Sequence, residues 1–136
     1  MSIFLQAYHS LLVWQKADDF VTEVYKTVLS FPKEELFGVI SQLRRAALSI
    51  ALNIVEGHAR GSQKEFVRFL IIARASNREC AYILEFCKKV GYLKNEQYEN
   101  LENKRRLSEY FIQKTIDKFT PKTTISTSNL KPPPTP

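Results

Sequence analysis

Apolar residues recur every three or four positions along most of this chain, the spacing that places side chains on one face of an α-helix. The pattern divides into four segments and predicts helices over residues 11–29, 36–55, 62–90 and 95–119. No segment shows a convincing strand pattern, so the predicted fold class is all-α. Four amphipathic helices joined by short connections are typical of an antiparallel up-down four-helix bundle.

The segment 36–55 is apolar over most of its circumference and organises the rest of the chain. Its predicted core face consists of residues spaced four and three apart, namely Leu36, Ile40, Leu43, Ala47, Ile50 and Ile54. Phe37, Leu48 and Val55 form a second apolar set about 100° round the helix. Two interpretations fit: burial between the subunits of a homo-oligomer, or a central helix of one bundle with an ordinary solvated stripe.

The other predicted helices each have one core face. On the first helix this face is formed by Trp14, Ala17, Val21, Val24 and Val28. On the third it is formed by Phe66, Phe69, Leu70, Ala73, Asn77, Cys80, Leu84 and Cys87. On the fourth, where the periodicity is weakest, it is formed by Leu101, Phe111, Ile112, Ile116 and Phe119. The cluster Lys104-Arg105-Arg106 is interpreted as part of the solvated face of that helix.

Capping and helix-breaking residues set the boundaries between these segments. Phe31-Pro32 ends the first helix or begins the second, because the residue before proline avoids helical dihedral angles. Ser62-Gln63-Lys64-Glu65 is typical of a capping box that opens the third helix. Gly91 is expected to end that helix, and Asn95 is expected to cap the fourth.

The chain is predicted to have three parts. Residues 1–10 show no period and are interpreted as a leader that lies across the domain. Residues 11–119 form the four-helix bundle, which is long enough to bury a core of its own. Residues 120–136 are rich in Pro, Thr and Ser and contain too few apolar residues to fold alone, so they are predicted to be a disordered tail.

Charge is concentrated in one part of the sequence. The formal net charge is +6, from 20 basic and 14 acidic residues. Residues 36–78 alone carry seven basic residues against two glutamates, which gives +5. This concentration favours an anionic partner, either a nucleic acid or an acidic protein surface.

The basic residues of the third helix and its start share one side of the helix. Arg60, Lys64, Arg68, Arg74 and Arg78 fall within about a third of the circumference, and the acids Glu65 and Glu79 are expected elsewhere. The apolar residues Val67, Ile71 and Tyr82 are interleaved with these cations. A mixture of this kind indicates a nucleic-acid surface or a protein interface.

Candidate catalytic chemistry is sparse, and the chain is predicted not to be an enzyme or to hold a metal or cofactor. The two histidines, His9 and His58, lack the spacing of a helical metal site, and no phosphate-binding loop is present. Cys80 and Cys87 fall on an apolar helix face, so they are expected to be buried, reduced thiols. With no secretion signal or membrane-spanning run in the sequence, the protein is expected to be cytoplasmic.

Several motifs in order along the chain resemble one known family. They are Val13-Trp14-Gln15-Lys16-Ala17, Phe31-Pro32 with Phe37-Gly38, Gln42-Leu43-Arg44-Arg45-Ala46, Asn53-Ile54-Val55-Glu56-Gly57 with Arg60, and Phe66 through Phe69-Leu70 to Ala73. This ordered set closely resembles the bacterial four-helix-bundle proteins encoded in intervening sequences of large-subunit ribosomal RNA genes. The resemblance covers residues 12–119.

The resemblance implies a ring-shaped homopentamer with a basic surface or a central pore, and no established enzymatic activity. A related branch, the accessory variability proteins of diversity-generating retroelements, is associated with a reverse transcriptase and with nucleic acid. The family signature corresponds here to Asn53, Glu56, Gly57 and Arg60. The sequence departs from the family at Ser49-Ile50-Ala51-Leu52, where a proline is frequent, and at Ala75-Ser76-Asn77, where Gly-Ser-Leu is common.

Two binding hypotheses follow. In the first, an oligomer binds RNA or DNA backbones through basic residues, which are Arg44, Arg45, Arg60, Lys64, Arg68, Arg74 and Arg78. In the second, the basic face docks an acidic protein, and the protein is an interaction scaffold. In both, Glu56 and Arg60 are expected to form an ion pair that stabilises the turn between the second and third helices.

Overall fold

The computed structural model describes residues 2–121 and residue 133 of the chain. Its long elements are the helices α1 Leu12–Thr27, α2 Val39–Ala59, α3 Gln63–Lys89 and α4 Asn95–Phe119. Short 3₁₀ turns lie at Ile3–Leu5, Tyr8–Ser10, Val28–Ser30 and Lys33–Glu35. The described residues include no strand, which confirms the all-α fold class and its four helices.

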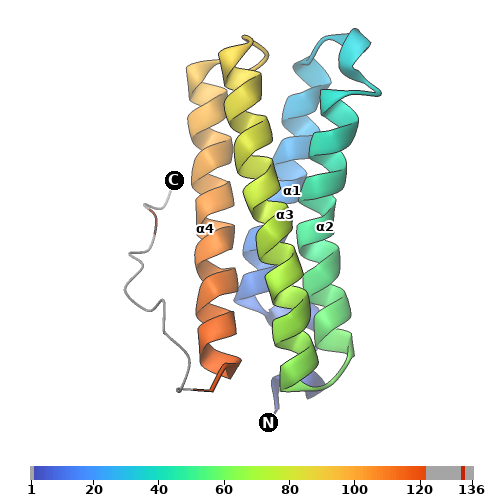
Figure 1. The fold of residues 1–136 in the computed structure, drawn as a ribbon, viewed down its shortest axis with the longest axis vertical. Coiled ribbons are helices and arrows are strands. Elements are labelled where there is room, and N and C mark those ends of the chain that lie inside the picture. Colours follow the sequence, from blue (N-terminus) through green and yellow to red (C-terminus); the bar gives the residue numbers. More distant parts are fainter. Residues whose placement is uncertain (1, 122–132, 134–136) are drawn as a thin grey trace.

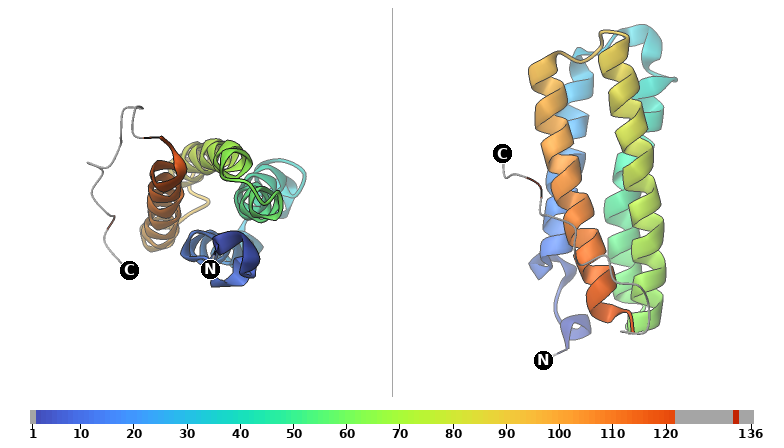
Figure 2. Two further views of the ribbon diagram at one scale, coloured as in Figure 1. Left: turned by 90° about the horizontal axis from the view of Figure 1, so that it is seen from below. Right: turned by 60° about the vertical axis from the view of Figure 1, so that its left-hand side comes forward.

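The four helices lie side by side along the long axis of the molecule (Figure 1). The α1–α2 and α3–α4 connections lie at one end of the bundle, and the α2–α3 connection lies at the other (Figure 1). Each helix packs against two neighbours, so that α1, α2, α3 and α4 enclose one core (Figure 2). Within the described part of the chain, no helix is both long enough and apolar enough to cross a membrane.

The core follows the predicted faces closely on two helices. All eight residues predicted to face inward from α3 are buried, including the polar Asn77. On α1, Ala17, Val21 and Val24 are buried, and Val28 is buried in the turn that follows, whereas Trp14 is only half-buried. The core of α4 contains Leu101, Ile112 and Ile116, while Phe111 and Phe119 pack on its edge.

The start of α2 differs from the prediction. The helix begins at Val39, and the side chains of Leu36 and Phe37 are 45% and 92% exposed. The reason lies in the backbone, because a 3₁₀ turn at Lys33–Glu35 precedes Gly38, whose φ of −110° and ψ of −112° are not helical. Leu36 and Phe37 precede the first residue of α2, so the helical periodicity does not direct their side chains toward the core. The prediction that Leu36 is a core residue was wrong.

Two predictions for α4 were also wrong. Lys94, and not Asn95, precedes the first turn, and its backbone N–H donates to Oε1 of Gln97 at 2.9 Å. Arg105 is buried instead of solvated, because its guanidinium reaches between α3 and α4 to hydrogen bond with Asn77. The sequence prediction grouped Arg105 with its neighbours Lys104 and Arg106 on the solvated face of α4. The periodicity of one helix contains no information about Asn77, its partner on another helix.

The N-terminal residues pack against the end of the bundle. The Phe4 ring lies 5.9 Å from the rings of both Phe66 and His58, and 6.4 Å from that of Phe119. Nε2 of His58 is 2.8 Å from the carbonyl oxygen of Ile3. The predicted tail, residues 120–136, falls outside the described residues except for Thr120, Pro121 and Pro133.

Candidate functional site

The α2–α3 connection brings the family-signature residues together around one close helix contact. A Cβ atom at Gly57 would lie 2.6 Å from Cβ of Phe69 and 3.2 Å from Cδ1 of Phe66. Real carbon atoms do not approach to 2.6 Å, so only glycine at this position lets the end of α2 lie against the start of α3. The glycine thereby sets the distance between the charged groups that the two helices carry.

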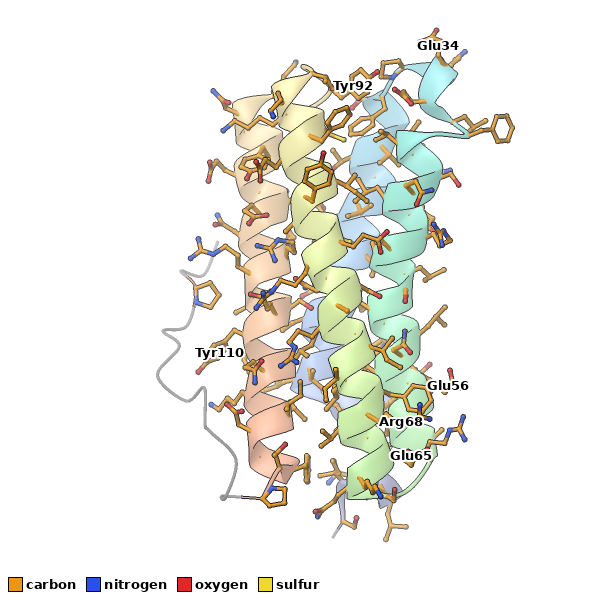
Figure 3. The ribbon with its side chains drawn as sticks, in the orientation of Figure 1. Glu34, Glu56, Glu65, Arg68, Tyr92 and Tyr110 are labelled. Carbon is orange, nitrogen blue, oxygen red and sulfur yellow. The ribbon has the colours of Figure 1, made fainter. Side chains whose placement is uncertain are left out.

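Two arginines lie over the Phe69 ring at this contact. The guanidinium carbons of Arg60 and Arg68 are 5.1 and 4.6 Å from the ring centroid. Arg60 pairs with Glu56 at 3.3 Å, which confirms the expected ion pair, and Arg68 pairs with Glu65 at 2.9 Å. Glu56, Glu65 and Arg68 all lie at this end of the bundle (Figure 3).

One acid at this end of the bundle, Glu65, is not placed as the sequence suggested. Glu65 was expected on another side of the helix, but its carboxylate accepts two hydrogen bonds from Arg68, because side chains three positions apart lie on one face. The hydrogen bond from Arg68 lowers the pKa of Glu65, and the charges of Arg68, Arg60 and Lys64 lower it further. The same hydrogen bond raises the pKa of Arg68.

The fourth signature residue, Asn53, links α2 to α3 through two serines. Its Nδ2 donates to the carbonyl oxygen of Ser49 at 2.8 Å and to Oγ of Ser49 at 3.0 Å. Oγ of Ser49 is in turn 3.0 Å from Oγ of Ser76 on α3. Neither serine was a predicted site residue, although both lie in the stretches where this sequence departs from the family pattern. The contact holds α2 and α3 in register above the glycine contact.

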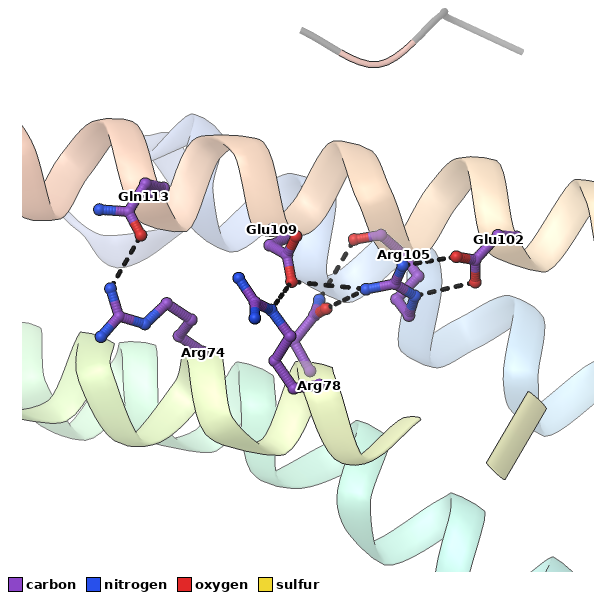
Figure 4. A network of polar contacts seen from close by, with 7 residues as sticks. Arg74, Arg78, Glu102, Arg105, Glu109 and Gln113 are labelled. Atoms are coloured by element: carbon purple, nitrogen blue, oxygen red, sulfur yellow. Dashed lines mark hydrogen bonds and ion pairs between the residues drawn. The ribbon is translucent and has the colours of Figure 1, made fainter. Parts of the chain in front are cut away.

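The other α3 arginines turn toward α4 (Figure 4). Nη1 of Arg74 donates to Oε1 of Gln113 at 2.8 Å, and Nε of Arg78 pairs with Glu109. Next to them Arg105 pairs with Glu102. Arg74 and Arg78 therefore bridge helices and do not join the cluster over Phe69.

The α2 arginines occupy a third region. The guanidinium carbon of Arg44 lies 5.3 Å from the centroid of the Tyr25 ring on α1. Nη2 of Arg45 donates to Oε1 of Gln42 at 2.6 Å on the exposed side of α2. The seven predicted cations thus fall into three groups, of which Arg60, Lys64 and Arg68 form the one at the α2–α3 connection, beside the signature residues Glu56 and Gly57. We call this group the hinge cluster.

Comparison with known proteins identifies the family of the chain. The model of the 23S rRNA-intervening sequence proteins matches residues 9–113. The chain belongs to this family. A solved protein of unknown function from the S23 ribosomal protein family of Bacteroides thetaiotaomicron is 25% identical, with a TM-score of 0.71 over 77% of this chain and 95% of that one. No curated protein matches the chain.

Potential metal ligands and thiols are the candidate reactive groups of residues 2–121. Within that part of the chain no three His, Cys, Asp or Glu side chains are placed to hold a metal ion. Burial raises the pKa of the Cys80 thiol to about 12 and that of the Cys87 thiol to about 11. Since the thiolate is the nucleophilic form, these thiols are unreactive near neutral pH.

Proposed function

We propose that this chain is a non-catalytic accessory protein that binds nucleic-acid backbones in the cytoplasm. In this proposal the bundle is antiparallel and up-down, and copies of the chain assemble into a ring-shaped homo-oligomer, a pentamer by analogy with the family. The family name, which refers to ribosomal RNA, supports a nucleic-acid context. Arg60, Lys64 and Arg68 are the proposed phosphate ligands.

The observation that carries this proposal is the weak internal pairing of the hinge cluster. The side chains of Arg60 and Glu56 are 47% and 57% exposed, and that of Arg68 is 56% exposed. Exposed ion pairs contribute little free energy, so a phosphate group can replace the carboxylate at small cost. The Phe69 ring beneath the two arginines limits their motion and holds both guanidinium groups on one side.

Repetition in a ring would multiply this effect. Each phosphate contact releases counterions, and the salt dependence of affinity grows in proportion to the number of contacts. A single subunit offers few cations, whereas several subunits present the hinge cluster several times to one strand. Binding is therefore expected to depend on charge and length and to show little sequence preference.

The test is a fluorescence-polarisation titration of a labelled single-stranded RNA at several salt concentrations. The variant Arg60→Gln/Arg68→Gln should weaken binding and reduce the magnitude of the slope of log affinity against log salt by about 1.4 for each subunit that contacts the strand, since each contact to a single strand contributes about 0.7. A matched control is Lys104→Gln/Arg106→Gln, which removes the same charge from another helix. The control should behave like the parent protein.

Equal salt slopes for the parent and the hinge-cluster variant would show that this surface is not the nucleic-acid site. If the parent protein binds no RNA or DNA even at low salt, the nucleic-acid proposal fails. The alternative function, an interaction scaffold for an acidic protein partner, would then be favoured. The exposed apolar side chains of Ile71 and Tyr82 on α3, 44% and 68% exposed, support that alternative.

A further inference from the structure

The turn between α1 and α2 carries an exposed phenylalanine, and hydrogen bonds hold the backbone next to it. Phe37 is 92% exposed, a large fraction for an aromatic side chain. The preceding Glu35 is held by three contacts: its carbonyl oxygen accepts from the N–H of Gly38 at 3.0 Å, and its carboxylate accepts from the N–H of Val39 at 3.3 Å and the hydroxyl of Tyr92 at 2.7 Å. The backbone that carries Phe37 is therefore held in place, which lowers the entropic cost of ordering the turn when the ring binds a partner.

An apolar groove lies between α1 and α2. Its volume is about 630 Å³. Its lining residues are Val21, Thr22, Tyr25, Lys26, Leu29 and Leu48. Leu29 and Leu48 are 77% and 39% exposed, so the groove is open to solvent. Phe37 is not among the lining residues and does not fill the groove of its own chain.

The charges beside the ring and beside the groove are opposite in sign. The turn at Lys33–Glu35 has two glutamates and one lysine, and Glu34 is exposed at the tip of the molecule (Figure 3). The groove contains Lys26 and has Arg44 stacked on its Tyr25 wall. Nε of Arg44 is buried and has no hydrogen-bond partner among the described residues, so the guanidinium charge beside the groove is not paired through this atom. The two surfaces thus complement each other in both polarity and charge.

We propose that Phe37 of one copy inserts into the α1–α2 groove of a second copy. This inference rests on the homo-oligomer in the proposed function and names the contact that builds it. Because the ring and the groove are different surfaces of one chain, each copy donates one and receives the other, which is a heterologous contact. Such contacts generate closed rings when the rotation between copies closes.

Sedimentation velocity over a range of concentrations tests the contact. Phe37→Ala should raise the dissociation constant of the assembly about tenfold or more, as expected when a central aromatic anchor is truncated. Leu48→Glu, which places a charge in the groove, should also disrupt assembly. Tyr82→Ala, which removes an aromatic side chain that is 68% exposed on α3, is the matched control and should assemble like the parent protein.

Disulfide trapping gives the direction of the contact. Oxidation of a mixture of Leu36→Cys and Leu48→Cys chains, which retain Phe37, should yield covalent dimers that contain one chain of each kind, and neither variant alone should cross-link; Leu36 is 45% exposed beside Phe37. The native Cys80 and Cys87 are buried and do not interfere. A chain with both substitutions should yield a ladder of covalent oligomers up to the size of the ring.

The outcomes separate this inference from the proposed function. If the parent protein is a monomer at micromolar concentration, both the ring and the Phe37 contact are overturned. An assembly that survives Phe37→Ala and Leu48→Glu unchanged overturns only the Phe37 contact. Cross-linking of Leu36→Cys chains with one another would show a symmetric contact between two turns and would also overturn it. Circular dichroism confirms that each variant is folded.

Discussion

Asn77 and Arg105 hydrogen bond to each other twice across the buried interface of α3 and α4. Nη1 of Arg105 donates to Oδ1 of Asn77 at 2.8 Å, and Nδ2 of Asn77 donates to the carbonyl oxygen of Arg105 at 3.2 Å. Burial by itself lowers the pKa of Arg105, but its hydrogen bond to Glu102 and the charges of Glu102 and Glu109 outweigh this effect and raise it. The arginine therefore remains charged inside the bundle.

Replacement of Asn77 by leucine should destabilise the protein. The change leaves Nη1 of the buried Arg105 without its Asn77 acceptor, which costs about 1–3 kcal/mol in free energy of unfolding. Arg105→Met should also destabilise, because it removes the donor to Oδ1 of Asn77. The double variant should lose less free energy of unfolding than the sum of the losses in the two single variants. In the double variant neither the Arg105 guanidinium nor the Asn77 side chain is left without its partner, because both are absent.

Urea unfolding of the parent, both single variants and the double variant measures this coupling. A coupling energy of about 0.5–3 kcal/mol is expected for two residues in direct contact. Strictly additive losses would contradict the prediction and would mean that Glu102 and Glu109 alone stabilise the charge of Arg105.

Gly57→Ala should destabilise the bundle by forcing α2 and α3 apart. The added methyl group would overlap Cβ of Phe69, which belongs to the rigid start of α3 and has no room to move away. Overpacking of this kind costs about 1–3 kcal/mol. Thermal unfolding monitored by circular dichroism should show the loss.

The control for this variant is Gly61→Asn. Gly61 has a φ of +75° and open space around its Cβ position, and asparagine adopts this left-handed conformation more readily than most residues. A smaller change at Gly61 than at Gly57 is therefore expected. Equal losses would indicate that the contact with Phe69 does not explain the effect, because alanine is otherwise a better helix former than glycine.

The two buried thiols should make the protein less stable at alkaline pH. Burial raises the folded-state pKa of Cys80 to about 12 and that of Cys87 to about 11, from a reference of 9.0. For groups whose pKa is raised in the folded state, the stabilisation is complete below the unfolded-state pKa and is lost as the pH rises toward the folded-state pKa. The free energy of unfolding should therefore fall from about pH 9 upward.

Urea midpoints at pH 8 and pH 10.5 test this dependence. The variant Cys80→Ala/Cys87→Ala loses the thiol contribution, so its midpoint should change less between the two pH values than that of the parent protein. Each protein is compared with itself at the two pH values, so the loss of stability caused by the smaller alanine side chains, which is the same at both pH values, cancels. An identical pH dependence in both proteins would assign the alkaline effect to other groups, such as the Tyr92 hydroxyl, whose hydrogen bond to Glu35 raises its pKa.

The sequence by itself determined the helices and most of the core. The spacing of apolar residues along α3 predicted all eight of its buried positions, because a continuous helix keeps a constant period from cap to cap. Ser62 at the start and Gly91 after the end also behave as predicted, since the Ser62 side chain accepts from the N–H of Glu65 and Gly91 has a φ of +87°. These features depend on residues that are near one another in the chain.

Only the tertiary structure decided which polar groups meet. Arg105 is buried because Asn77, 28 positions earlier, supplies its acceptor, and Arg74 reaches Gln113, 39 positions later. The exposure of Phe37 depends on the non-helical backbone of Gly38 and on Tyr92 of the neighbouring α3–α4 connection, whose hydroxyl donates to Glu35. Periodicity reports the direction of a side chain from its own helix, whereas these contacts depend on the distance between helices, which Gly57 and the packed core set.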